Sequence, residues 1–356
     1  MSQNTTIIKT SFERDTLEGI VIPLVSLIGM LEYIVCFLIF NNAEFLNKDR
    51  LKENLYWYLK IEAFFITINF FMQVLRFLFF EPTIETTLLA NIYRLYFLIF
   101  FAGVLEMSAL ICRITSTINF YTILTNKSVN FNWIHKISKY FTTLMIFVIS
   151  FLLLFYTTVC FYIRDDKIEE IDGFNLTVSH RVYSLGVTEF SRSTSKKIIQ
   201  TAVYLIRDLF MILFLFILDI LICLNVVNSL KSKKKLLYAA NNEATTSFEI
   251  NKESKKKQIN KINRIQRANI KIVMMIVLAS FNNIFGRIPV LVQQILENFI
   301  DMKDFYKIAA LMVYMSYVVN FFIYICFNKR FRKILGRYLS IFRKCEKIRL
   351  RNNDES

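Results

Sequence analysis

The sequence predicts an all-α membrane protein, a seven-transmembrane helix bundle followed by a short amphipathic eighth helix. Three observations favour this fold class. Hydrophobic residues make up 55% of the 356 residues, with 36 Phe but only 7 Gly and 3 Pro, and the mean hydropathy is positive, at +0.42. Seven apolar runs each reach the ~20 residues that a helix needs to cross a bilayer. A basic amphipathic segment follows the last run.

The amino-terminal tail, residues 1–19, carries Glu13, Asp15 and Glu18 and has no apolar core, so it does not resemble a cleavable signal peptide. We therefore expect the first apolar run to be the signal for membrane insertion. The predicted transmembrane domain covers residues 20–327. Its seven helices are predicted at about residues 20–40, 55–80, 88–124, 140–163, 198–228, 272–296 and 308–327.

The distribution of Lys and Arg between the loops favours an extracellular amino end. In that orientation the inner segments hold 28 Lys and Arg, and the outer segments hold 10. Without the long third inner loop the comparison is 16 against 10, in the direction that the positive-inside rule requires. The sequons at Asn4 and Asn175 would then be extracellular and glycosylated, whereas the sequon at Asn126 would be cytoplasmic and unused.

The third cytoplasmic loop, at about residues 229–271, is polar and rich in Lys, Asn and Ser. We expect its first half, including the stretch from Ala239, to be poorly ordered because it has little apolar area to bury. From Lys255 onward, isoleucines recur at near-helical spacing, which predicts an extension of the sixth helix.

Residues 328–343 have the pattern of an amphipathic helix that lies at the membrane interface. Apolar residues recur at three- and four-residue spacing with Lys and Arg between them. An ordinary solvated tail is the alternative. Residues 344–356 form the predicted cytoplasmic tail, in which Cys345 is either a candidate for palmitoylation or a free reduced thiol.

The junction between the seventh apolar run and the eighth helix carries a spaced motif. It consists of Asn320, Tyr324, Asn328, Phe331 and Arg332. This order resembles the NPxxYxxxNxxFR pattern of rhodopsin-like (class A) G-protein-coupled receptors, with Phe321 at the family's proline position. The resemblance implies a divergent, invertebrate-type receptor of the plasma membrane that binds an extracellular ligand and signals to a heterotrimeric G protein. It also implies roles in activation for Asn320 and Tyr324.

At the inner end of the third apolar run, Asn119, Phe120 and Tyr121 lie where this family has its DRY triplet. The resemblance places all three residues in the G-protein coupling region, but only the tyrosine of the triplet is kept. In the family, the triplet arginine reaches toward the G protein and the tyrosine of the seventh helix. Phe120 has no charge or donor with which to do that.

Arg113 lies two helical turns deeper and shares a helical face with Glu106 and Phe120, because the three are spaced by seven residues. An unpaired charge at that depth costs at least ~2.5 kcal/mol. We therefore predict an intramembrane ion pair between Arg113 and either Glu106 or Glu62 of the second helix. Such a pair would be either a switch or a fixed packing contact.

Charged residues in the third, fifth and sixth helices are candidates for contact with a ligand. They are Glu106, Arg207, Asp208 and Arg287. The arginines would suit a ligand with a carboxylate, such as a peptide terminus or a small acid. By the resemblance, Ala102 stands where amine receptors have their ammonium-binding aspartate, so we expect a peptide or a small chemosensory molecule, not an amine. No cysteine stands near Leu95, so the family's usual disulfide is not expected.

Other functional classes are disfavoured. The net charge of +16 is concentrated in loops beside the apolar runs, which indicates membrane topology and no nucleic-acid partner. His135 and His180 fall on opposite sides of the predicted membrane, and we find no metal, cofactor or nucleophile constellation, so no enzyme is predicted. The paired, Gly- or Pro-interrupted helices of a transporter are missing. The main alternative is a seven-transmembrane chemosensory ion-channel subunit of inverted topology, which contradicts the charge count.

Overall fold

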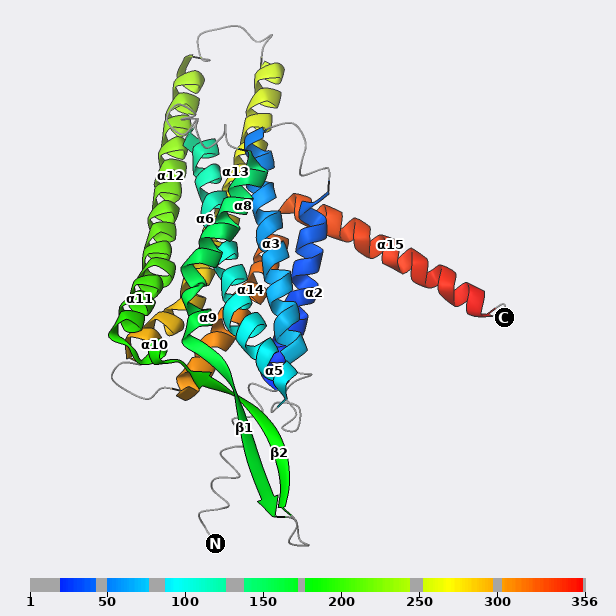
Figure 1. Cartoon of the computed structure of the whole chain (residues 1–356). Helices are drawn as coiled ribbons and strands as arrows, with labels where there is room; N and C mark the ends of the chain where they lie inside the picture. The colour runs from blue at the N-terminus through cyan, green and yellow to red at the C-terminus, as the bar shows by residue number, and fades with distance from the viewer. Residues whose placement is uncertain are drawn as a thin grey trace, which may run out of the picture.

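A computed structural model describes residues 20–42, 50–76, 87–125, 138–171, 177–243, 252–296 and 303–354. Within these residues, seven helical segments are long and apolar enough to cross a membrane. They form one bundle, from which two long helices extend at one end and a β-hairpin extends at the other (Figure 1). The predicted seven-helix architecture is therefore confirmed.

Several crossing segments consist of more than one helical element. The first four crossings are α2 (Ile22–Phe40), α3 (Arg50–Arg76), α5 (Leu88–Ile92) with η3 (Tyr93–Phe101) and α6 (Ala102–Thr125), and α8 (Lys139–Leu154) with α9 (Tyr156–Cys160). The last three are α11 (Thr194–Tyr204) with η4 (Leu205–Phe210) and α12 (Met211–Glu243), α13 (Lys252–Leu296), and α14 (Lys303–Phe327). The elements η3 and η4 are π-helical, a local winding that the apolar pattern does not predict.

The bundle exposes apolar side chains and buries polar ones. Leu152 of α8 and Phe210 of η4 are largely exposed, whereas Glu62, Asp208 and Asn320 are buried. In hydrocarbon, an apolar surface needs no cover, but every polar group must find its partner inside the protein. This distribution is that of a multi-pass membrane protein.

Two glycines allow neighbouring helices to approach closely. A Cβ atom at Gly29 of α2 would lie 2.5 Å from the ring of Phe70 in α3. A Cβ atom at Gly286 of α13 would lie 2.5 Å from Cβ of Ser316 in α14. Small residues at such contacts bring helix backbones together in membranes, where close packing replaces the hydrophobic driving force.

The helices α12 and α13 continue well beyond the rest of the bundle (Figure 1). α12 reaches Glu243, so the expectation that the first half of the third inner loop is poorly ordered was wrong up to that residue. Residues 236–240 are Leu, Ala and Tyr, and they extend a helix that is already formed, which avoids the cost of nucleation. α13 begins at Lys252, which confirms the predicted extension of the sixth helix.

The helix α15 (Lys329–Asp354) begins directly after α14 and extends away from the bundle (Figure 1). Asn328 Oδ1 accepts a hydrogen bond from the backbone N–H of Phe331 at 3.1 Å, as an N-cap does. Arg332 donates to the last carbonyls of α14, those of Ile325 at 2.7 Å and Cys326 at 2.5 Å. The eighth helix is therefore longer than the predicted 328–343, and the predicted tail is helical as far as Asp354.

The connection between the fourth and fifth crossings contains an antiparallel hairpin that the sequence analysis missed. β1 (Phe161–Ile171) pairs with β2 (Thr177–Val187), and the short helix α10 (Glu189–Arg192) follows. The buried amide of Asn91 in α5 donates to the carbonyl of Tyr183 at 2.9 Å. The Thr188 hydroxyl donates to the carbonyl of Val159 at 2.8 Å. The all-α fold class is thus correct except for this hairpin.

Candidate functional site

Polar side chains gather at three successive levels in the interior of the bundle. The helix α14 contributes to each level, through Tyr317, Asn320 and Tyr324. Spacings of three and four residues place these side chains on one face of α14, over a length of about 10 Å. We call the levels the four-charge cluster, the asparagine cluster and the inner ion pair.

The inner ion pair joins Arg113 of α6 to Glu62 of α3. Nε of Arg113 donates to both carboxylate oxygens of Glu62 at 2.9 Å, and Nη2 donates to Oε1 as well. Nη2 also donates to the hydroxyl oxygen of Tyr324 at 3.1 Å. The side chains of Arg113 and Glu62 are each only 3% exposed. One guanidinium therefore links α3, α6 and α14 in a dry environment, where such bonds are electrostatically strong.

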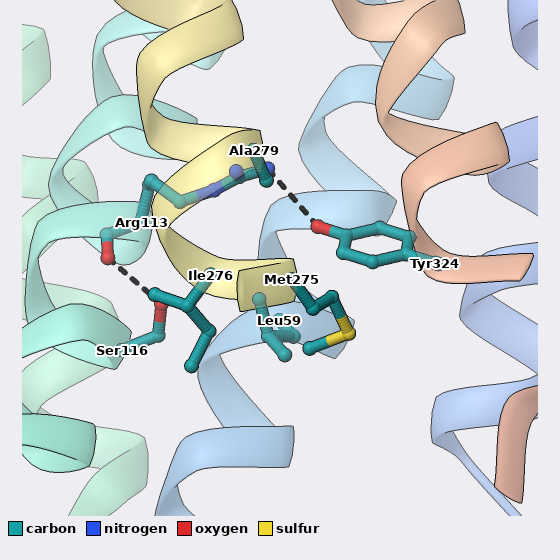
Figure 2. Close-up of a pocket in the computed structure, with 7 residues that line it drawn as sticks. All are labelled: Leu59, Arg113, Ser116, Met275, Ile276, Ala279 and Tyr324. Atoms are coloured by element: carbon teal, nitrogen blue, oxygen red, sulfur yellow. Dashed lines mark hydrogen bonds between the residues drawn. The ribbon is translucent and has the colours of Figure 1, made fainter. Parts of the chain in front are cut away.

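The inner ion pair is tightly enclosed. The ring of Tyr324 contacts the rings of Phe40 and Phe331, with centroids 5.5 and 6.0 Å away. Figure 2 shows Arg113 and Tyr324 beside a small cavity, whose other lining residues are Leu59, Ser116, Met275, Ile276 and Ala279. Its volume of about 10 Å³ is space for about one water molecule, so this cavity does not hold a ligand.

The asparagine cluster joins α13 to α14. Asn282 Nδ2 donates to the carbonyl of Ser316 at 2.5 Å and to Oδ1 of Asn320 at 3.0 Å. Asn320 Nδ2 in turn donates to Oδ1 of Asn283 at 2.8 Å. Asn320, a residue of the predicted activation motif, is thus fully buried and hydrogen-bonded to both asparagines of the neighbouring helix.

The four-charge cluster joins α6, η4, α13 and α14. Arg287 donates to Glu106 Oε1 at 2.8 Å, to the Tyr317 hydroxyl at 3.0 Å and to Asp208 Oδ1 at 3.3 Å. Arg207 donates to Asp208 through Nη2 at 2.6 Å and through Nε at 3.0 and 3.1 Å. The four candidate ligand-binding residues therefore do come together in space.

The charges of this cluster balance, two guanidinium groups against two carboxylates. The arginines are already occupied by Asp208 and Glu106, so a ligand carboxylate would have to displace one of these groups. Glu106 and Arg207 are the accessible members, with side chains 27% and 16% exposed, against 5% for Arg287 and 0% for Asp208. Of the two partners considered for Arg113, Glu106 is excluded because it pairs with Arg287.

The three residues aligned with the DRY triplet have no contact of the kind that the family's arginine makes. Asn119 donates to the carbonyl of Thr115 within its own helix, at 2.8 Å. Phe120 is buried in the apolar core, and Tyr121 packs at the margin of that core. Arg113 is the residue that reaches the tyrosine of the seventh crossing.

Some predicted sites fall outside what the structure describes. Asn4 and Asn175, the predicted glycosylation sites, lie outside the described residues. Cys345 lies within α15, but its side chain is not described. In the described parts of the chain, no group of three or more His, Cys, Asp or Glu could hold a metal ion.

Sequence reasoning missed Tyr317, Asn282 and Asn283. The seven-residue spacing between Tyr317 and Tyr324 was a usable signal, because it predicts that both rings lie on one face of the helix. For the asparagines the only signal was their type, since two adjacent amides in a membrane-spanning helix need partners.

No protein-family model matches the sequence, and a search of curated proteins found no similar sequence. Among solved structures, the chain is similar to squid rhodopsin, with a TM-score of 0.57 and 14% sequence identity. The similarity covers 92% of this chain and 86% of the rhodopsin chain. The protein therefore has the rhodopsin-like seven-helix fold.

Proposed function

We propose that the chain is a divergent rhodopsin-like G-protein-coupled receptor, and not an enzyme. It binds an extracellular ligand and signals to a heterotrimeric G protein from the plasma membrane, with its amino end outside. The proposal includes glycosylation at Asn4 and Asn175 and palmitoylation at Cys345.

The contact between Arg113 and Tyr324 carries this proposal. In rhodopsin-like receptors an arginine of the third helix acts together with the tyrosine of the seventh. Here Phe120 takes the usual arginine position, but Arg113 supplies a guanidinium 3.1 Å from the Tyr324 hydroxyl. We propose that this contact holds the third and seventh crossings together in the resting state, and that the pair with Glu62 keeps Arg113 charged and oriented.

The four-charge cluster supports the ligand-binding part of the proposal. Glu106 and Arg207 are its accessible members, so a peptide or small chemosensory molecule would meet them first. A ligand that draws Glu106 away from Arg287 would leave Arg287 to Asp208 and Tyr317. That change in partners would favour one arrangement of α6, α13 and α14 over another, which is how a ligand shifts a bundle between two states.

The inverted chemosensory ion-channel subunit is not favoured, since it requires the opposite orientation and is not suggested by the likeness to rhodopsin. The orientation is tested by glycosidase treatment of the expressed protein, comparing wild type with Asn4→Gln, Asn175→Gln and the double variant. We expect a mobility shift that disappears only in the double variant. If Asn126 is glycosylated instead, the topology of the chain is inverted, and the proposed G-protein coupling is wrong.

Coupling is tested with Tyr324→Phe, which removes the hydroxyl group and leaves the Arg113–Glu62 pair in place. A hydrogen bond to a charged group contributes ~1.5–3 kcal/mol. We expect the loss of this bond to raise basal nucleotide exchange about tenfold on at least one heterotrimeric G protein in vesicles. Tyr338→Phe in α15 is the matched control and should not change the rate. If no G protein responds to the wild type or to Tyr324→Phe, the proposed coupling is wrong.

A further inference from the structure

A basic site lies on the outside of the bundle, at the end from which α12 and α13 extend (Figure 1). Its centre is the indole ring of Trp57 in α3. The ammonium nitrogen of Lys60 lies 4.1 Å from the ring centroid, and that of Lys139 in α8 lies 4.9 Å from it. Two like charges thus share one aromatic ring, which attracts each of them.

Contacts with α8 and α2 fix the position of the Trp57 ring and of Lys60. Tyr140 of α8 packs edge-on against Trp57, with ring centroids 4.8 Å apart. The indole N–H of Trp57 donates to the Thr143 hydroxyl at 3.1 Å, which fixes the ring against α8. On the other side, Lys60 donates to Oδ1 of Asn41 at the end of α2, at 3.3 Å. α3 packs against both α2 and α8, so the three helices meet at this site.

The electrostatics of this site favour an anion. In the described part of the chain, Lys60 contacts an amide oxygen and an aromatic face but no carboxylate. The site also includes the first turn of α8, where the N-cap residue Ser138 makes no side-chain cap hydrogen bond. The positive end of the helix dipole therefore adds to the two ammonium charges.

Exposed apolar side chains on the same three helices determine the kind of anion. They lie about one helical turn further along each helix than Asn41, Lys60 and Tyr140. These are Leu38 of α2, Phe64 of α3 and Leu144 of α8. Cations at one level and exposed apolar side chains about one turn away on the same helices match an amphiphile with an anionic head, because basic sites between helices at the headgroup level bind anionic lipids.

We propose that Lys60, Lys139 and the Trp57 ring bind the phosphate headgroup of an anionic phospholipid, whose acyl chains lie along Leu38, Phe64 and Leu144. The site does not depend on receptor activity, and it is separate from the four-charge cluster and the inner ion pair. A bound headgroup would join α2, α3 and α8 at their shared end and so stabilise the bundle.

The first test measures the melting temperature of the purified full-length protein in neutral detergent. We expect dioctanoyl phosphatidic acid to raise it, while dioctanoyl phosphatidylcholine and glycerol phosphate at the same concentrations do not. Lys60→Gln/Lys139→Gln should remove the increase. Lys329→Gln/Lys333→Gln, in the basic helix α15, should keep it. An increase with glycerol phosphate would show a free phosphate site and overturn the proposal, as would a full increase in Lys60→Gln/Lys139→Gln.

The second test leaves both lysines in place, so it does not depend on the folding of the double variant. The chain has two tryptophans, Trp57 and Trp133, so Trp133→Phe makes Trp57 the only indole fluorophore. We expect brominated phosphatidic acid to quench Trp57 at least about twofold more than brominated phosphatidylcholine, since the anionic lipid is enriched at the site. Equal quenching by the two lipids would contradict the proposal.

Discussion

The inner ion pair and the four-charge cluster both place arginine and carboxylate groups inside a membrane-spanning bundle, but they differ in access and in redundancy. Glu62 and Arg113 are each 3% exposed, and Glu62 is the only carboxylate paired with Arg113 in the described residues. In the four-charge cluster, Glu106 is 27% exposed, and Arg287 has a second carboxylate partner in Asp208 and a hydroxyl partner in Tyr317.

This difference indicates two distinct roles. A fully enclosed pair without a substitute partner holds one arrangement of helices firmly, because separating its charges in a dry core is costly. A cluster with alternative partners and an accessible carboxylate can exchange contacts at a smaller energetic cost. On the proposed function, the inner ion pair is therefore suited to hold one state of the bundle, and the four-charge cluster is suited to respond to a ligand.

The largest expected effect comes from replacing a glutamate with glutamine, a change that should affect stability differently at the two sites. Glu62→Gln should destabilise the protein by ~3–5 kcal/mol, because it leaves the Arg113 charge buried without its counter-ion. Glu106→Gln should cost only about 1 kcal/mol, because Arg287 keeps Asp208 and Tyr317 and the new amide is partly exposed. Unfolding of the purified proteins in the same detergent measures both values. Equal losses would refute the proposed difference between the sites.

A second change tests whether the inner ion pair serves stability or function. Replacing both partners, Glu62→Leu/Arg113→Leu, removes the charges and the need to pair them, so most of the stability lost in Glu62→Gln should return, to within ~1–2 kcal/mol of wild type. Basal nucleotide exchange should nevertheless rise as in Tyr324→Phe, because the tie to α14 is gone. A stable double variant with wild-type basal exchange would make the pair a packing contact only.

The bundle was predictable because the pattern that codes for it is local. Each crossing is a run of apolar residues of sufficient length, and such a run can be recognised without knowing how the helices pack. Arg113 was also predictable as a paired residue, since its depth made an unpaired charge too costly. Its partner was left open between Glu62 and Glu106, because helix periodicity gives the face of a residue but not the neighbour that the face meets.

The missed features depend on contacts between distant parts of the chain. The hairpin residues Asp165 to Glu170 are mostly charged and carry little strand signal. β1 is held by its pairing with β2, and β2 in turn accepts the hydrogen bond from Asn91 at Tyr183. The π-helical segment Leu205–Phe210 includes both Arg207 and Asp208. Such a local change in winding re-aims side chains and has no compositional signature.

The smallest expected effect concerns the end of the bundle that carries the hairpin, where the buried amide of Asn91 in α5 donates a hydrogen bond to the hairpin. Asn91→Ala removes the donor to the Tyr183 carbonyl, a bond that contributes ~1 kcal/mol. Local opening of the hairpin should then increase about fivefold, with no change in the buried inner half, since local stability varies between regions of one protein. Hydrogen exchange of the β1 and β2 amides measures this effect.

A neighbouring hydrogen bond of the hairpin provides the control for Asn91→Ala. Thr188→Val, which removes the hydroxyl donor to Val159 at the base of the hairpin, serves as the matched control for loss of one neighbouring hydrogen bond. If the proposed ligand contacts the hairpin, Asn91→Ala should also lower the response to that ligand while leaving basal nucleotide exchange unchanged. Faster hydrogen exchange of the backbone amides around Arg113 in Asn91→Ala would instead mean that the two ends of the bundle are coupled even without a ligand.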